Sequence, residues 1–355
     1  MSRASMNIKK KPGFKEEFSL DRLYDNAVKM EAETEPQAPK IRMSSFPFCP
    51  KKFLFNCLES IDGGLWSFTG DFYCDIGTAV HSALQKWMPL ANPGTILGNW
   101  SCDACGKWVK DKNPSNPKGR IWKPYVVKAL VGPINCPKCG QPMKYEEFEF
   151  MLPEAPASGH CDGILLYDPS SVLNMKLTDN YYVLDKILRD PDFGKKIPAY
   201  ILEYKTSGLN VLSQRSKPKN EHQCQATMYV SAARRILPQK YGLVNLDVRG
   251  FIIKYIARDR PQARSQDLKY EIDSDDTFYM RQCEMVNIFD KAVMTRDIKY
   301  MKAMYKCFPC KEIPDIYNDC PYFTDCEAVT AKEFKSLVKK AKEVYEKSRV
   351  GDKHV

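Results

Sequence analysis

One stretch decides the fold: Ala199-Tyr200-Ile201-Leu202-Glu203-Tyr204-Lys205-Thr206-Ser207, an apolar run that ends with a carboxylate and a lysine two residues apart. Successive side chains of a β-strand point to opposite faces, so Glu203 and Lys205 would project together, with Tyr204 on the other side. Burying both charges without partners is costly. The pair is therefore either an ordinary ion pair at a strand end or part of a site that holds a metal ion, a counter-ion or a phosphate.

The composition is that of a globular chain with a basic excess. Its 355 residues, 43% of them hydrophobic, can bury a sizeable core, and we expect one main domain with an insertion. The formal net charge of +10 suits a polyanionic partner, but it also suits a basic protein without one. The N-terminus lacks an apolar signal region and no apolar run could span a bilayer, so we expect a cytoplasmic, reduced protein without a membrane partner.

Fourteen cysteines in a reducing compartment favour metal ligands over disulfides. Two C-x-x-C-G motifs match what tetrahedral Zn²⁺ requires, because each turn presents two thiolates and the glycine lets the backbone fold back toward the ion. Four thiolates close the coordination sphere, so the ion would be structural, in a zinc ribbon inserted at 95–143. The four expected ligands are Cys102, Cys105, Cys136 and Cys139. Basic residues around them suit either a nucleic-acid contact or a solvated loop: Lys107, Lys110, Lys112, Lys118, Arg120 and Lys123.

The rest of the chain alternates expected strands and helices. Residues 1–40 are polar, and we expect them to be poorly ordered, with a short helix at 21–31 at most. Ser44 and Ser45 suit a helix N-terminus, with the following aromatic and basic residues in its first turns. The remaining expected helices are 75–88, 182–188, 221–236, 275–304 and 330–349, and the expected strands are 145–152, 160–167, 199–207 and 246–256. This alternation predicts an α/β domain around a mixed sheet.

Four short motifs follow one another along this pattern. They are Gly77-Thr78-Ala79-Val80-His81 in a helix, Gly159-His160-Cys161-Asp162 at a strand, Glu203-Tyr204-Lys205 at a strand end, and Gln225-Ala226-Thr227-Met228-Tyr229 in a helix. Their order resembles the RecB-type branch of the P-D-(D/E)-x-K nuclease superfamily. The resemblance implies a restriction-endonuclease-like core over 41–355, with a central mixed sheet flanked by helices and the zinc ribbon as an insertion.

The resemblance also implies a site. Cutting a phosphodiester needs a cation that neutralises the phosphate and lowers the pKa of a bound water, and hard divalent ions take oxygen ligands. Mg²⁺ or Mn²⁺ would be held by Asp162, Glu203, the Tyr204 carbonyl and His81, whose nitrogen favours Mn²⁺. On position alone, His81 could also be a satisfied histidine at the edge of the core.

The implied catalytic residues are Asp162, Glu203, Lys205, Gln225 and Tyr229. Lys205 would orient the attacking water or stabilise developing charge, and its role as a general base is open. Gln225 and Tyr229 lie four apart and share a helical face. They would hold the nucleic-acid backbone or position Lys205, whereas in the alternative interpretation Tyr229 only packs its helix.

Some nucleases of this type hold a [4Fe-4S] cluster with one cysteine ahead of the histidine helix and three after the tyrosine helix. Cys49 resembles the first ligand, and Cys320 and Cys326 resemble the last two. The family pattern puts the other ligand three residues before Cys320, where this chain has Tyr317. Within the expected cluster segment 305–327, the substitute is Cys310, with Cys307 as its alternative. Zinc in the same four thiolates is the other possibility. The five remaining thiols should be packed in the core: Cys57, Cys74, Cys161, Cys224 and Cys283.

The implied activity is DNA cleavage. The chain has no G-x-x-x-x-G-K-[ST] motif and hence no helicase motor of its own, and a separate helicase or recombination protein is an expected partner beside DNA. The resemblance implies an exonuclease that acts on single-stranded DNA or DNA ends in recombination, repair or end processing. The alternatives are a structure-specific endonuclease and a catalytically inactive zinc and iron-sulfur protein that binds nucleic acid. The joint presence of Asp162, Glu203 and Lys205 argues against an inactive protein.

Overall fold

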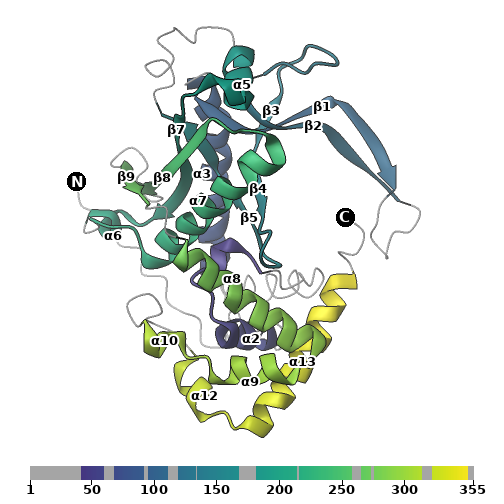
Figure 1. The fold of residues 1–355 in the computed structure, drawn as a ribbon, viewed down its shortest axis with the longest axis vertical. Coiled ribbons are helices and arrows are strands. Elements are labelled where there is room, and N and C mark those ends of the chain that lie inside the picture. Colours follow the sequence, from purple (N-terminus) through teal and green to yellow (C-terminus); the bar gives the residue numbers. More distant parts are fainter. Residues whose placement is uncertain are drawn as a thin grey trace, which may run out of the picture.

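The computed structural model describes residues 41–59, 68–91, 95–110, 119–132, 134–167, 181–213, 216–257, 265–272, 276–313 and 322–350. The expectations for residues 1–40 lie outside this part of the chain. A sheet with helices on its faces occupies the upper half of Figure 1, and a group of helices forms the lower half. The predicted central mixed sheet flanked by helices is therefore confirmed.

The central sheet has seven strands in the order β2-β1-β6-β7-β8-β9, and β3 pairs with β1 off this path. Its strands are β1 (Ile96–Lys110), β2 (Arg120–Gly132), β3 (Lys144–Glu146), β6 (Gly163–Leu166), β7 (Ile197–Ser207), β8 (Leu246–Ala257) and β9 (Ser265–Glu271). Only β7 and β8 run parallel, and the other pairs are antiparallel. A separate hairpin pairs β4 (Phe148–Met151) with β5 (Ser158–Cys161).

The opening stretch forms the middle of the sheet because nearly all of β7 is buried. Its first eight residues are buried and its last three are half-buried, so the strand runs from the core toward solvent. Helix α3 (Phe68–Ala91) packs on one face, where Val80 and Leu84 contact Leu202 and Tyr204. Helix α7 (Asn220–Tyr241) covers the other face of β7 and β8. Side chains that alternate along β7 therefore meet different helices.

The lower group of helices is built from two distant parts of the chain (Figure 1). Phe48 donates its backbone N–H to Gln282 Oε1 at 2.7 Å, and the buried Lys51 Nζ donates to the Tyr305 carbonyl at 2.9 Å. The elements of this group are η1 (Met43–Ser45), α2 (Pro50–Glu59), α8 (Thr277–Asp290), η3 (Lys291–Thr295), α9 (Ile298–Lys306), α10 (Pro309–Glu312), α12 (Phe323–Ala328) and α13 (Ala331–Val350). The three other short elements are α5 (Tyr181–Arg189), η2 (Pro191–Phe193) and α6 (Leu209–Ser213).

Two helix predictions were wrong in their boundaries. The helix expected over 275–304 is broken, because Arg296 has a left-handed backbone (φ 54°) and the Asp297 side chain caps α9 by accepting from Lys299 N at 2.8 Å. The helix expected to begin at Ser44 and Ser45 begins at Pro50 instead. The two serines lie in a single 3₁₀ turn. The helix begins only at Pro50, because proline suits the first helical position and the residue before a proline disfavours the helical conformation.

Candidate functional site

Asp162 lies in the gap between two strands and next to the end of β7. Strand β5 ends at Cys161 and β6 begins at Gly163, so Asp162 belongs to neither. Tyr204 donates its backbone N–H to Asp162 Oδ2 at 2.6 Å, and the Tyr145 hydroxyl donates to the Asp162 carbonyl at 2.8 Å. The two bonds hold a carboxylate that is only 5% exposed at the edge of β7.

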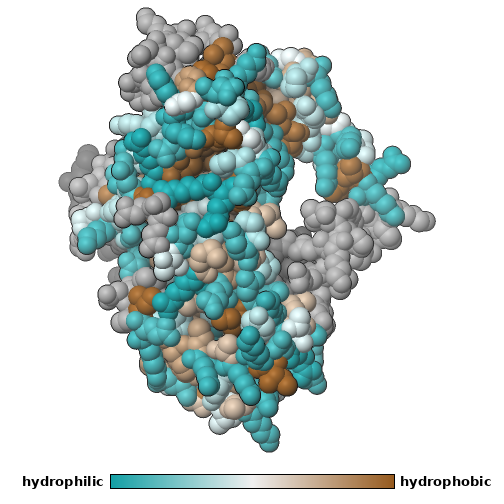
Figure 2. All heavy atoms as spheres, viewed as in Figure 1, coloured by the Kyte–Doolittle hydropathy of each residue, from teal (hydrophilic) through white to brown (hydrophobic). Residues whose placement is uncertain are grey.

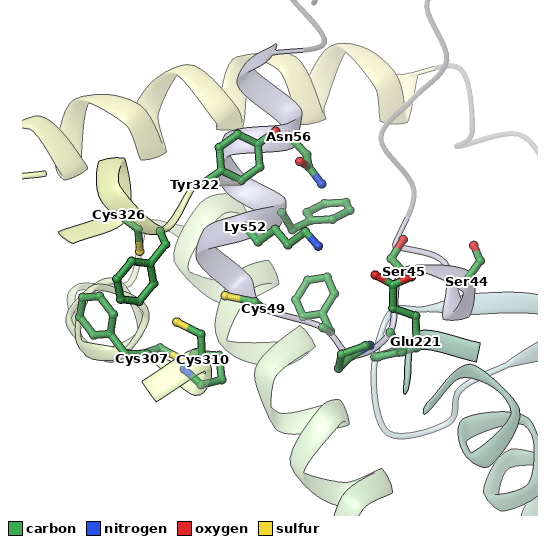
Figure 3. A pocket seen from close by; sticks show the side chains of 17 residues that line it. Ser44, Ser45, Cys49, Lys52, Asn56, Glu221, Cys307, Cys310, Tyr322 and Cys326 are labelled. Atoms are coloured by element: carbon green, nitrogen blue, oxygen red, sulfur yellow. The ribbon is translucent and has the colours of Figure 1, made fainter. Parts of the chain in front are cut away.

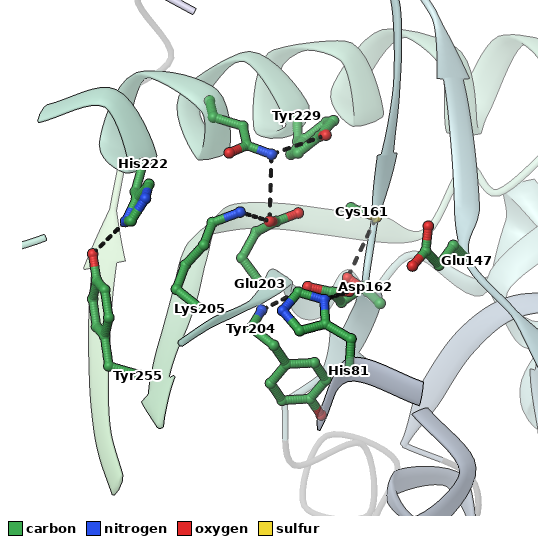
Figure 4. Close-up of polar contacts among 12 residues, drawn as sticks. His81, Glu147, Cys161, Asp162, Glu203, Tyr204, Lys205, His222, Tyr229 and Tyr255 are labelled. Atoms are coloured by element: carbon green, nitrogen blue, oxygen red, sulfur yellow. Dashed lines mark hydrogen bonds and ion pairs between the residues drawn. The ribbon is translucent and has the colours of Figure 1, made fainter. Parts of the chain in front are cut away.

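Glu203 and Lys205 project together as the alternation predicts, and Tyr204 points to the opposite face (Figure 4). Lys205 Nζ lies 3.0 Å from Glu203 Oε2, while the Glu203 side chain is 3% exposed and that of Lys205 is 19% exposed. The second oxygen, Glu203 Oε1, is buried and has no hydrogen-bond donor among the described residues. One carboxylate oxygen is thus satisfied by the lysine, and the other lacks a partner of any kind in this part of the chain.

Helix α3 brings a histidine and a glutamine to Asp162. His81 Nδ1 lies 3.3 Å from Asp162 Oδ1, and Gln85 Nε2 donates to the same oxygen at 3.2 Å. The two residues are four apart and share a helical face. Gly77 lets the helix approach β7 closely, because it has no side chain. A Cβ at this position would lie only 3.3 Å from Thr206 Oγ1. His81 is therefore a partner of Asp162 rather than a histidine satisfied elsewhere at the edge of the core.

Helix α7 contributes the glutamine and tyrosine from the other face. Gln225 Nε2 donates to the Tyr229 hydroxyl at 3.2 Å and reaches Glu203 Oε2 at 3.5 Å. Tyr229 is 1% exposed and packs on Phe150, with ring centroids 6.0 Å apart. A Cβ on Gly159 would lie 2.8 Å from the Tyr229 ring, so glycine is needed there for close packing. Tyr229 therefore both packs its helix and contacts the glutamine beside Glu203.

Two polar residues of this network were not predicted. Gln85 Nε2 donates to Glu147 Oε1 at 2.6 Å as well as to Asp162, so it joins the two carboxylates. The sequence holds one usable signal for Gln85, its position four residues after His81. Glu147 gave no such signal, because it lies inside the strand expected over 145–152, and the structure shows that it separates β3 from β4.

Burial dominates the electrostatics of the site. It raises the pKa of Glu203 to about 7; Lys205 opposes the shift and Asp162 adds to it. Burial lowers the pKa of Lys205, but the Glu203 carboxylate outweighs that effect and leaves the pKa raised. Burial also lowers the pKa of His81, and the hydrogen bond and charge of Asp162 again leave it raised. Burial therefore disfavours the charged form of Glu203, and Lys205 offsets this effect only in part.

The donor set fits a hard divalent cation. Strand β6 pairs with β7 only as far as Leu202. The N–H and C=O of one strand residue point to the same edge, so the Tyr204 carbonyl faces the edge at which its N–H meets Asp162. Two carboxylates, that carbonyl and the His81 imidazole are suitable ligands, and Glu203 Oε1 lacks a partner. His81, Asp162 and Glu203 are nevertheless not among the described groups whose ligand atoms all lie within 4.8 Å of one another.

The group that meets this distance is the four-cysteine cluster. The Sγ atoms of Cys102, Cys105, Cys136 and Cys139 all lie within 4.8 Å of one another, and those of Cys102 and Cys139 are 3.7 Å apart. A tetrahedron with Zn–S bonds of about 2.3 Å has edges of about 3.8 Å. Burial would raise the pKa of Cys136, but the backbone N–H groups of Lys138 and Cys139 lower it to about 7. These four cysteines could therefore bind a metal.

The two glycines of the cysteine motifs serve different purposes. Gly140 has a left-handed backbone (φ 73°) and donates its N–H to the Cys136 carbonyl at 2.8 Å, so it closes the turn as expected. Gly106 is required by packing instead, because a Cβ there would lie 2.6 Å from the Trp122 ring. The segment is also not a separate sheet, since Ile96 and Leu97 of β1 pair with β6.

A second group of cysteines lines a cavity of about 240 Å³ among the lower helices (Figure 3). Cys49 comes from the start of α2, and Cys307, Cys310 and Cys326 come from the segment around α10 and α12. Both Cys307 and Cys310 line the cavity, so the choice between them stays a prediction. Cys320 lies outside the described residues. Burial raises the pKa of Cys49 to about 12 and that of Cys307 to about 11.

Four of the five thiols expected to pack in the core do so: Cys57, Cys161, Cys224 and Cys283 are buried. The side chain of Cys74 lies outside the described part of the structure.

The fold defines an α/β protein with a central mixed sheet and a four-cysteine cluster between β1 and the turn that follows β2. None of the helices that the structure describes is long and apolar enough to cross a membrane. Comparison with protein families, curated proteins and solved structures finds no match to this chain. Its function must therefore be argued from the two cysteine groups and the polar site at β7.

Proposed function

We propose that this chain is a metal-dependent DNA nuclease of the RecB type, an exonuclease that acts on single-stranded DNA or DNA ends in recombination, repair or end processing. One observation carries the proposal. Polar residues from α3, the β5–β6 gap, β7 and α7 meet at the edge of β7 where its pairing with β6 has ended. They surround the buried Glu203 Oε1, which has no donor among the described residues. An ordinary ion pair between Glu203 and Lys205 would need neither Asp162 nor the glutamines.

The side chains divide the work by position. Asp162 and Glu203 would hold the cation together with His81 and the Tyr204 carbonyl. Mg²⁺ or Mn²⁺, when bound, would neutralise charge on the phosphate and lower the pKa of a bound water. Lys205 lies beside Glu203 with its side chain 19% exposed, so it would donate to the attacking water or to a non-bridging oxygen and stabilise developing charge.

Other residues hold this arrangement in place. The Tyr204 N–H and Gln85 fix the orientation of Asp162, and Gln225 connects Glu203 with Tyr229. Partners of this kind orient ligands and restrict their rotamers. We expect loss of Gln85 or Gln225 to weaken activity by about 10- to 100-fold, less than loss of a ligand.

The test is cleavage of end-labelled DNA with Mn²⁺ or Mg²⁺. Asp162→Asn and Lys205→Met should each lower the rate by at least about 100-fold. Two variants serve as matched controls. Glu149→Gln changes an exposed carboxylate beside His160, and Lys254→Met breaks an exposed ion pair between Lys254 of β8 and Asp267 of β9. Undiminished cleavage in both site variants would refute this site, and closed circular DNA distinguishes an exonuclease from an endonuclease.

We further propose a structural Zn²⁺ at Cys102, Cys105, Cys136 and Cys139, because the Sγ spacing fits a single tetrahedral ion. We propose a [4Fe-4S] cluster at Cys49, Cys310, Cys320 and Cys326, with Cys307 as the alternative to Cys310. The support for the cluster is that the described members of the set line one cavity. They are not among the described groups whose ligand atoms all lie within 4.8 Å of one another, as the four cysteines of the zinc site are. Visible absorption of anaerobically purified protein, with elemental analysis, distinguishes this cluster from a second zinc ion.

A further inference from the structure

The hairpin of β1 and β2 projects from the sheet as an arm that lies apart from the helices (Figure 1). Beyond the cysteine cluster, its outer part pairs residues 107–110 with 120–123. Trp108 and Trp122 lie opposite each other there, with ring centroids 5.4 Å apart and ring planes at 67°. Trp108 is 62% exposed and Trp122 is 41% exposed. Figure 2 shows the arm covered largely by hydrophilic side chains, with one hydrophobic patch among them.

Cations surround the two tryptophans in a pattern that costs stability. Lys107 lies opposite Lys123, and Lys110 lies opposite Arg120. Like charges directly across an antiparallel pair are destabilising. All four side chains are exposed, and none forms an ion pair within the part of the chain that the structure describes. A polyanion bound along the arm would offset this repulsion, whereas a second copy of this basic chain would add to it.

Alternation along the strands sorts these side chains onto two faces. Residues two apart share a face, so Trp108 lies beside Lys110, and Trp122 lies beside Arg120. One face of the arm therefore carries two indole rings next to two cations. Indole rings stack on unpaired bases, and neighbouring cations contact the phosphates. A duplex keeps its base faces covered and offers only base edges and phosphates.

Residues of the two cysteine motifs pack against the aromatic side chains of β2. The Trp122 ring lies against Gly106, the residue that follows Cys105, and only a glycine leaves room for it there. Lys138, in the other cysteine motif, places its Nζ 3.9 Å from the centre of the Tyr125 ring on β2. A metal ion at the four cysteines would thus hold the platform in one conformation before a ligand arrives.

We propose that the outer arm binds single-stranded nucleic acid, with bases stacked on Trp108 and Trp122 and phosphates contacted by Lys110 and Arg120. The surface lies apart from the residues around Glu203. Its role as a substrate-holding element rests on the proposed nuclease function, but its ability to bind a single strand does not.

The experiment measures binding of a labelled oligothymidylate of about 20 nucleotides to the full chain carrying Asp162→Asn, without added divalent cation. Trp108→Ala and Trp122→Ala should each weaken binding about tenfold, and Trp108→Phe should recover most of the loss because it keeps an aromatic face. Lys110→Gln should lower the salt slope of binding by about 0.7, the value of one single-strand phosphate contact. Oligouridylate should bind through the same two residues, since stacking does not depend on the sugar.

The control is Trp87→Ala, which removes a 59% exposed tryptophan from α3 and should leave the affinity unchanged. Zinc content and the unfolding temperature of each variant report whether the arm is intact. Unchanged affinity in both arm variants, an equal loss in Trp87→Ala, or equal binding of a blunt duplex would overturn the proposal. If the arm variants bind weakly and the wild-type protein does not cleave DNA, the nuclease function is refuted and the binding role of the arm stands. If the enzyme is active and its arm variants bind normally, the binding role of the arm is refuted and the nuclease function stands.

Discussion

Replacing Lys205 with methionine in the metal-free protein would leave Glu203 as a buried charge without its counter-ion. The carboxylate is 3% exposed, and one oxygen already lacks a donor among the described residues. Removing one partner of a buried pair costs about 3–5 kcal/mol, and the 19% exposure of Lys205 favours the lower end. At about 3 kcal/mol, we expect the unfolding temperature of a chain of 355 residues to fall by roughly 4 °C.

Three comparisons separate charge from packing in this experiment. The double variant Glu203→Gln with Lys205→Met should recover most of the loss, because no buried charge is left. Lys254→Met, which breaks an exposed ion pair, should cost less than about 1 kcal/mol. Mn²⁺ should reduce the difference in unfolding temperature between wild type and Lys205→Met, because a cation bound at Glu203 supplies the missing positive charge. A Lys205→Met variant as stable as wild type would refute this account of the site.

The pH dependence of the metal-free protein has a definite sign. Because burial raises the pKa of Glu203 to about 7, its protonated form adds stability that is fully present below the ordinary pKa of 4.5. That stability is lost as the pH rises from about 4.5 through 7. Lys205 lowers the pKa of Glu203, so Lys205→Met should extend the loss to higher pH. Thermal unfolding across this range measures it, and Glu203→Gln should remove this component.

Three further predictions concern other parts of the chain. Cys139→Ser should lower the zinc content measured by elemental analysis, because it removes one of four clustered thiolates. Gly159→Ala should cost about 1–3 kcal/mol in denaturant unfolding, since its Cβ would meet the Tyr229 ring at 2.8 Å, whereas Gly208→Ala, with open space around it, should cost much less. Asp297→Ala removes the cap of α9 and should cost about 1 kcal/mol by the same measurement; an unchanged stability would show that the cap is dispensable.

Local patterns predicted the elements that are strongly apolar or strictly periodic. β7, β8, α7 and α13 lie close to their expected positions, because β7 is a continuous apolar run and the other three contain recurring apolar positions. Strand β9 was missed, since it reads Ser-Gln-Asp-Leu-Lys-Tyr-Glu at the edge of the sheet and has little apolar pattern. The break at Arg296 depends on one left-handed residue, which arginine adopts rarely and which no periodicity records.

In the candidate site, too, local sequence patterns predicted some residues and missed others. Residues in short motifs were found, because His81, Asp162, Glu203 and Gln225 carry recognisable spacing. Gln85 and Glu147 were missed, because the hydrogen bond between them joins residues 62 positions apart and is set by how α3 packs on the sheet. The arm shows the limit in another form. The lysines were noted, but the pairing of Trp108 with Trp122 depends on a register shift between Cys102 and Lys107.

The bond from Lys51 to the Tyr305 carbonyl also bears on synthesis. The two residues are 254 positions apart, and the bond from Phe48 to Gln282 spans 234. A ribosome releases the chain from its N-terminus, so α2 emerges long before α8 and α9 exist to cover its apolar side chains. The sheet from β1 to β9 can form in that interval, whereas the lower helices must wait. During translation, the apolar side chains of α2 therefore stay uncovered by α8 and α9 until those helices emerge.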